Sequence, residues 1–187
     1  IPELWEVPAI FRNRLGDQVG RQRAMVSDGH LLIILHEPPR PDDTTRDGRL
    51  FWRNTDGAWS AYDLEGQIKS LEGHFEQYKK RIDELDAREE TATTADQYFE
   101  LLSELTALHR AARNQHAAFQ EARQQIDSRD LINFRDRAYS IERLAELLQI
   151  DSKNALDLTI ARRSEEQAET GQHMALSAHR LNVLAAF

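Results

Sequence analysis

The chain has 187 residues, of which 40% are apolar and 30% charged, as in soluble globular or coiled-coil proteins rather than disordered ones. Its net charge of −8, without a basic block, argues against a protein that binds nucleic acid through the phosphate backbone. The lack of cysteine excludes disulfides and thiolate metal sites and favours a reducing compartment. No stretch reaches the roughly 18 apolar residues that a membrane span needs.

Residues 1–63 differ in kind from the rest, because they hold all five prolines and all three tryptophans. The continuous apolar run 31–35 lies between Asp28-Gly29 and Pro38-Pro39, which predicts a buried strand. This first segment is therefore expected to form a small antiparallel β unit.

Residues 49–63 are typical of a β-hairpin around Asp56-Gly57, a dipeptide that favours the two-residue type I′ turn. A two-residue loop pairs Trp52 with Ala61 and Asn54 with Trp59. These two pairs share one face, so the hairpin is expected to place both indoles on the same side of the sheet.

Residues 64–127 change to the three-and-four spacing of amphipathic helices and predict an antiparallel helical hairpin. The first helical stripe consists of Leu64, Ile68, Leu71, Phe75, Tyr78, Ile82 and Leu85. Thr94 followed by Gln97 predicts a capping box at the start of the second helix. The second stripe consists of Tyr98, Leu101, Leu105, Leu108, Ala112, Phe119, Ala122 and Ile126.

Residues 128–187 contain no proline and one glycine, which predicts a single stalk helix about 90 Å long. Its apolar stripe disappears through the polar stretch 162–173 and returns at Met174. An isolated helix that is polar on all sides is marginal in water, so we expect it to be bundled with copies of itself around a wet axis. The expected fold class is α+β.

This order of elements resembles the cytosolic part of CorA-type magnesium transporters, a two-transmembrane family with a Gly-x-Asn motif. The stretch 173–187 looks like the junction where the family's stalk helix enters the bilayer. Arg129-Asp130-Leu131 resembles the family's Arg-Asp-Val/Leu step at the stalk start. The family usually has a larger α/β sheet than residues 1–63 can supply, and its Gly-Met-Asn loop would lie beyond Phe187.

The resemblance implies a funnel-shaped homopentamer in the cell inner or plasma membrane, with this chain on the cytoplasmic side and missing membrane spans after Phe187. Its stalk helices would line a path for hydrated Mg²⁺ or other divalent cations. This implies a regulatory and stalk domain rather than an enzyme. The alternative from the sequence is a non-enzymatic helical scaffold that binds partners through its coiled hairpin.

Glu166, Glu169, Thr170 and His173 share one helix face, and a symmetric ring would repeat them around the axis. Rings of carboxylates concentrate cations and hold hydrated Mg²⁺ through water. The competing interpretation is an ordinary solvated face with Arg162 and Glu166 as an ion pair one turn apart.

Asp130 matches the family position where a stalk aspartate helps to bind a regulatory divalent ion between subunits. The alternative is an acid at a helix start, stabilised by the helix dipole. Apolar side chains near the end of the stalk are candidates for a dewetting gate, although ordinary helix packing explains them equally well. The gate candidates are Met174, Leu181, Leu184 and Phe187.

Two other groups of residues suggest no site. His109 and His116 lie two turns apart, so they are expected to be surface or core-edge histidines rather than zinc ligands. Four arginines flank the glycines at 16 and 20, but the spacing matches neither a Walker A loop nor a dinucleotide fingerprint. These are Arg12, Arg14, Arg21 and Arg23, and a charged β-arm is the simpler interpretation. The sequence contains no defensible catalytic motif.

Overall fold

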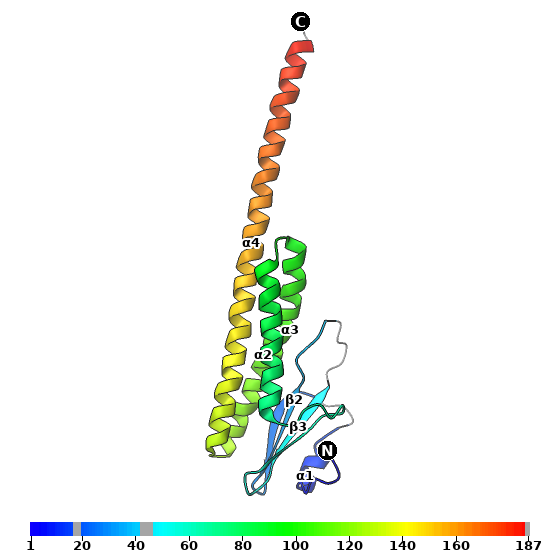
Figure 1. Cartoon of the computed structure of the whole chain (residues 1–187), viewed down its shortest axis with the longest axis vertical. Coiled ribbons are helices and arrows are strands. Elements are labelled where there is room, and N and C mark those ends of the chain that lie inside the picture. The colour runs from blue at the N-terminus through cyan, green and yellow to red at the C-terminus, as the bar shows by residue number, and fades with distance from the viewer. Residues whose placement is uncertain (17–19, 42–46, 186–187) are drawn as a thin grey trace.

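The computed structural model describes residues 1–16, 20–41 and 47–185. A small sheet lies at one end, three long helices stand over it, and the last helix extends far beyond the other two (Figure 1). The elements in chain order are α1 Ala9–Asn13, β1 Arg23–Ser27, β2 His30–His36, β3 Gly48–Arg53, β4 Trp59–Tyr62, α2 Leu71–Thr91, α3 Ala95–Gln125 and α4 Arg129–Ala185. The α+β class and the small antiparallel sheet are therefore confirmed.

The sheet has the order β1-β2-β3-β4, and all neighbouring strands are antiparallel. All five residues of the apolar run on β2 are fully buried, because both faces of the sheet are covered. Leu31, Ile33 and Leu35 point into the core shared with the helices. Leu32 and Ile34 pack instead with Phe11 and other residues of the N-terminal arm. The continuous apolar run thus correctly predicted a strand buried on both sides.

The predicted register of the second hairpin is wrong by one residue. Arg53 pairs with Trp59 and Trp52 pairs with Ser60. The Asn54 side-chain oxygen accepts hydrogen bonds from the backbone N–H groups of Asp56 and Ala58, at 3.1 and 2.8 Å. This side chain stabilises a loop that is one residue longer than a type I′ turn.

The shifted register places the two indoles on opposite faces of the sheet. Trp52 packs beside Trp5 of the N-terminal arm, with ring centroids 5.6 Å apart. Trp59 meets Phe134 of α4 edge-on, with centroids 5.7 Å apart. A shift of one residue exchanges the faces of a strand, so the expectation of a shared tryptophan face is wrong.

The two helices of the central segment begin at capping residues. α2 begins at Leu71 rather than at Leu64, and the Ser70 hydroxyl accepts a hydrogen bond from the N–H of Gly73. Leu64 is 72% exposed and precedes the helix, so the apolar spacing alone placed the helix start too early. The capping box of Thr94 and Gln97 at the start of α3 is confirmed.

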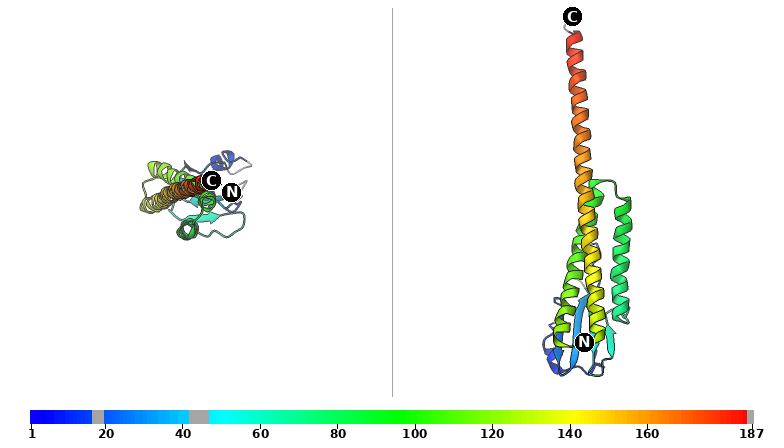
Figure 2. Two further views of the ribbon diagram at one scale, coloured as in Figure 1. Left: turned by 90° about the horizontal axis from the view of Figure 1, so that it is seen from above. Right: turned by 90° about the vertical axis from the view of Figure 1, so that its left-hand side faces the viewer.

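The three long helices share an aromatic core above the sheet. Phe75 of α2, Phe119 of α3 and Phe134 of α4 have ring centroids 5.6 to 6.2 Å apart. Small residues let the backbone of α3 pack closely in this core, and Ala111, Ala112, Ala118 and Ala122 are all buried. Two views show α3 and α4 running side by side in opposite directions (Figure 2). This packing fixes the lower half of α4.

α4 is one helix of 57 residues, and it continues through Gly171 without folding back. Its length is about 86 Å. Thr159 is its last partly buried residue, and every side chain described after it is exposed. We call residues 160–185 the free segment of α4; it extends beyond the other helices in Figure 1. None of the helices, as far as the chain is described, is long and apolar enough to cross a membrane.

Candidate functional site

The predicted metal residues lie at two separate places on α4. Asp130 is in the first turn of the helix, whereas Glu166, Glu169 and His173 are on the free segment. The rise of an α-helix separates Asp130 from Glu166 by roughly 54 Å. Within the described ranges, no three histidine, aspartate or glutamate side chains lie close enough to hold a metal ion. A single copy therefore presents these residues as separate groups.

Asp130 is held by two side chains of the hairpin formed by β3 and β4. Its Oδ2 accepts a hydrogen bond of 2.7 Å from the Trp59 indole nitrogen and one of 3.3 Å from Nε of Arg53. Partial burial by itself raises the pKa of Asp130, but the bond from Trp59 and the charge of Arg53 outweigh it, so that the pKa lies below its ordinary value. Asp130 is ionised and engaged within its own chain.

The acidic part of the free segment is fully exposed. Glu166, Glu169 and His173 all face solvent, and the Thr170 hydroxyl donates to the backbone carbonyl of Glu166 at 2.8 Å. Glu166 also lines a pocket with Thr93 and Thr94, where α4 passes the loop between α2 and α3. The side chains that were predicted to attract cations are therefore exposed to solvent in the single chain.

The gate candidates are only partly described. Met174 and Leu181 are 66% and 67% exposed on the free segment. The Leu184 side chain and the whole of Phe187 lie outside the described residues. Large apolar side chains exposed on a free helix are suited to contact with other chains or with an apolar surface.

A buried polar network that the sequence analysis did not identify joins the sheet to the helices. His74 of α2 is fully buried. Arg49 of β3 donates to its Nδ1 at 3.1 Å, and Nε2 lies 2.8 Å from Oε1 of Gln115 on α3. Since Nδ1 accepts, the proton of the neutral ring is on Nε2 and is donated to Gln115.

The burial of His74 sets its charge state. Burial, reinforced by the charge of Arg49, lowers the pKa of His74 to about 3, despite the opposing hydrogen bond to Gln115. A second Arg49 nitrogen donates to Gln77 at 2.6 Å, and Glu37 lies 3.6 Å from the same nitrogen. The network therefore stays neutral at His74 and carries its positive charge on Arg49.

One sequence signal could have identified this network. His74 occupies an apolar position, three residues after Leu71 and four before Tyr78. A polar residue within a helical stripe of apolar residues indicates a buried hydrogen-bonding group. By contrast, His109 and His116 lie at the edge of the core, where they contact Gln149 and Glu142 of α4. Their interpretation as core-edge histidines is confirmed.

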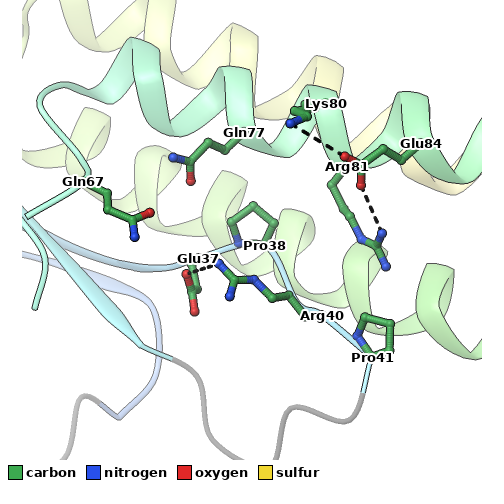
Figure 3. Close-up of a pocket in the computed structure, with 9 residues that line it drawn as sticks. All are labelled: Glu37, Pro38, Arg40, Pro41, Gln67, Gln77, Lys80, Arg81 and Glu84. Carbon is green, nitrogen blue, oxygen red and sulfur yellow. Dashed lines mark hydrogen bonds and ion pairs between the residues drawn. The ribbon is translucent and has the colours of Figure 1, made fainter. Parts of the chain in front are cut away.

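A cleft of about 450 Å³ lies between α2 and the segment after β2 (Figure 3). Its charged groups are paired with one another: Arg40 lies 3.7 Å from Glu37, and Glu84 lies 3.2 Å from Arg81 and 4.0 Å from Lys80. The nine lining residues include no histidine and no hydroxyl or thiol side chain. The charges of the cleft are thus engaged in ion pairs between its own lining residues.

The arginines of the N-terminal arm bind their own backbone. Arg12 donates to the carbonyls of Ile1, Pro2 and Trp5. Arg23 donates to the carbonyls of Arg21 and Arg14. These contacts agree with a charged arm, but the expectation that the arm is β is wrong at Arg12, which lies on the short helix α1.

The fold resembles known structures although the sequence is distant from them. The cytoplasmic domain of ZntB from Vibrio parahaemolyticus superposes with a TM-score of 0.64 at 15% identity, over 86% of this chain and 80% of that one. Full-length CmaX gives a TM-score of 0.64 at 15% identity, over 89% of this chain and 68% of that one. No family model and no curated protein sequence matches this chain. At this identity the likeness establishes the fold.

Proposed function

We propose that this chain is the cytoplasmic stalk domain of a CorA-type divalent-cation transporter or channel, with Mg²⁺ as the favoured ion. The observation that carries the proposal is the free segment of α4, which projects from a fold shared with the cytoplasmic domain of ZntB. A helix that leaves its own core for about 39 Å is suited to reaching a membrane. The chain would lie on the cytoplasmic side of the inner or plasma membrane.

The proposed assembly is a homopentamer whose α4 helices surround a hydrated path. Copies around an axis place the same residues at the same height, so that single carboxylates become rings. Glu166, Glu169 and His173 are the proposed cation-attracting residues of the free segment. Because Mg²⁺ loses its water reluctantly, such a collar would hold the hydrated ion through its water shell.

Transport in this proposal needs no covalent chemistry in the chain. The acidic residues raise the local cation concentration, the axial path keeps the ion hydrated, and contacts between subunits set the gate. Asp130 takes part by fixing the base of α4 to the sheet through Trp59 and Arg53. Met174, Leu181, Leu184 and Phe187 remain the proposed apolar constriction.

The test is divalent-cation flux through the full gene product in proteoliposomes, measured with a dye for Mg²⁺ and then for Zn²⁺, Co²⁺ and Ni²⁺. We expect flux that saturates with the cation and stops when hexaamminecobalt, a mimic of hydrated Mg²⁺, is added. No flux with any of these ions, in liposomes that contain correctly folded protein, would falsify the proposal and leave the scaffold interpretation. Flux of Zn²⁺ without Mg²⁺ would contradict only the choice of ion.

A further inference from the structure

A line of exposed residues along α4, beside the face that packs on α2 and α3, follows a heptad repeat. The repeat takes alternate steps of three and four from Leu144 to His179, and every one of its side chains is exposed. It begins with Leu144 and Leu147, passes Asp151, Asn154, Leu158 and Ala161, and continues through Ala168 and Ala175. We call this line of residues the α4 seam. A sustained three-and-four spacing is the pattern of helices that pack on one another in a coiled coil.

The seam is distinct from the face that α4 uses within its own chain. The buried side chains of this part of the helix include Ala145, Leu148 and Leu156. At 3.6 residues per turn, Ala145 and Leu156 lie on the opposite side from Leu147 and Leu158, and Leu148 lies about a quarter turn from them. α4 therefore has an exposed face beside the one that packs on α2 and α3.

The lower seam carries three exposed leucines, with the exposed Asp151 and Asn154 between the second and the third. Leu144, Leu147 and Leu158 are 47%, 41% and 51% exposed. Leu144 also lines a cavity of about 290 Å³ between α2 and α4, together with Phe75 and Ile141. A helix laid along the seam would bury these leucines and could place a side chain in that cavity.

The charges beside the seam favour a second copy in parallel. Seam positions come in pairs that are three residues apart, such as Leu158 and Ala161. In a parallel coiled coil, the residue just before the first member of a pair faces the residue just after the second member on the neighbouring helix, which is five places later. This rule brings Asp157 of one copy to Arg162 of the next, and both are exposed in the single chain. We infer that copies of this chain pack through the α4 seam, in parallel and in register, and turn Glu165, Gln172 and His179 toward the shared axis. The inference rests on the proposed function and assigns the axis-facing residues of its assembly.

The upper seam explains why the axis would be hydrated. Ala161, Ala168 and Ala175 allow the helix backbones to approach closely, while Glu165, Gln172 and His179 alternate with them. Like charges at one height in a dry core would be strongly unfavourable, so the Glu165 ring requires water or cations between the helices. Glu166 and His173 are rotated off this line. Met174 and Leu181 lie on the opposite side of the helix from Gln172 and His179, so with the seam at the axis they would face outward and would not form the apolar constriction. The carboxylate nearest the axis is thus Glu165, and Glu166 lies at the outside of the collar.

Cysteine cross-linking tests this assignment, because residues 1–187 contain no cysteine. Any cysteine elsewhere in the gene product would first be replaced by serine. Ala168→Cys lies on the seam, whereas Thr170→Cys lies at nearly the same height on the opposite face and is equally exposed. The full gene product in membranes would be treated with a short bismaleimide and with an oxidant, since disulfides need Cα atoms within about 7 Å. We expect Ala168→Cys to form cross-linked ladders at least tenfold faster than Thr170→Cys. Equal cross-linking rates for Ala168→Cys and Thr170→Cys would overturn the inference, as would faster cross-linking of His173→Cys. The inference would also be overturned if Ala168→Cys reacts with a monomaleimide, which shows that the thiol is accessible, but forms no cross-link.

A matched pair of apolar positions gives a second readout. Leu158 on the seam and Ile160 off it are 51% and 45% exposed, so serine at either position should leave the fold intact. We expect Leu158→Ser to reduce the fraction of oligomer by at least threefold, measured by native mass spectrometry, and Ile160→Ser to leave it unchanged. Equal effects of the two substitutions would overturn the inference. If the protein conducts cations but the seam and off-seam cysteines cross-link equally, only the inference about the seam is contradicted. If the seam cysteines cross-link preferentially but the protein conducts no cations, only the proposed function is contradicted.

Discussion

The carboxylate of Asp130, in the first turn of α4, accepts a 2.7 Å hydrogen bond from the indole nitrogen of Trp59, which lies 71 positions earlier on β4. Arg53 on β3 binds the same oxygen. The base of the longest helix is thereby fixed to the end of the sheet hairpin. These two side chains therefore join the hairpin of β3 and β4 directly to the first turn of α4.

Replacing Asp130 by asparagine should lower the free energy of unfolding by about 1–2 kcal/mol, because both hydrogen bonds lose their charged acceptor. Urea denaturation at pH 7 measures this loss. Asp136→Asn is the matched control, since Asp136 is an exposed acid in the same helix that binds only the adjacent Arg135 side chain. An equal effect of the two substitutions would show that the bond to Trp59 does not stabilise the fold.

The same variant has a defined pH dependence. The pKa of Asp130 is lowered from 3.8, so its ionised form stabilises the folded state above pH 3.8, and this contribution is lost as the pH falls through the lowered pKa. The free energy of unfolding of Asp130→Asn should therefore differ most from that of the natural chain near neutral pH, and the two values should converge in acid.

The same variant also tests Asp130 as a ligand of a regulatory ion. If Mg²⁺ protects Asp130→Asn from proteolysis as well as it protects the natural chain, Asp130 is not such a ligand.

Gly57→Ala should destabilise the fold by about 1–2 kcal/mol, as judged by thermal unfolding. Gly57 has a φ of +88°, and an added Cβ would lie 3.0 Å from a guanidinium nitrogen of Arg53. The change strains the loop and displaces the partner of Asp130. Gly16→Ala is the control, since nothing lies within 4 Å of a Cβ at that position. A neutral Gly57→Ala would contradict the strained loop.

His74 should make the protein less stable as the pH falls below 6.5. Its pKa is about 3 in the folded chain, so the unfolded chain binds more protons between pH 6.5 and 3. The free energy of unfolding should fall in this window by at most about 1.4 kcal/mol per pH unit from this residue. His74→Gln, which can still bond to both Arg49 and Gln115, should flatten the slope. An unchanged slope in His74→Gln would contradict the buried network.

Gly171→Ala should stiffen the free segment of α4 without changing the stability of the core. An added Cβ there meets no atom within 4 Å, and alanine favours a helix interior over glycine by about 1 kcal/mol. Hydrogen exchange of amides 165–179 should slow several-fold, while core amides such as that of Phe119 are unaffected. Ala178→Gly should have the opposite effect. If neither substitution changes exchange in this segment, α4 is stabilised there by neighbouring chains.

Local sequence patterns were sufficient for the elements that depend on near neighbours. The Thr94 and Gln97 capping box involves only three residues of separation, and the apolar run on β2 is a continuous signal. The predicted register of the second hairpin was wrong because the Asn54 side chain accepts hydrogen bonds from the backbone N–H groups of Asp56 and Ala58 and so stabilises a longer loop. The rule that Asp-Gly favours a two-residue turn does not take the preceding side chain into account. The start of α2 was predicted too early because the helical spacing of apolar residues continues into the loop before Ser70.

The long helix follows from sequence alone, because residues 128–187 contain no proline and a single glycine, so that nothing interrupts the backbone hydrogen bonds of α4. Which of its faces is buried, which acids remain in water, and what binds Asp130 were decided only by the tertiary structure. Those outcomes depend on contacts across dozens of residues, such as Trp59 with Asp130 and His74 with Gln115. Periodicity assigns residues to a helix face, but only packing determines which face is left exposed.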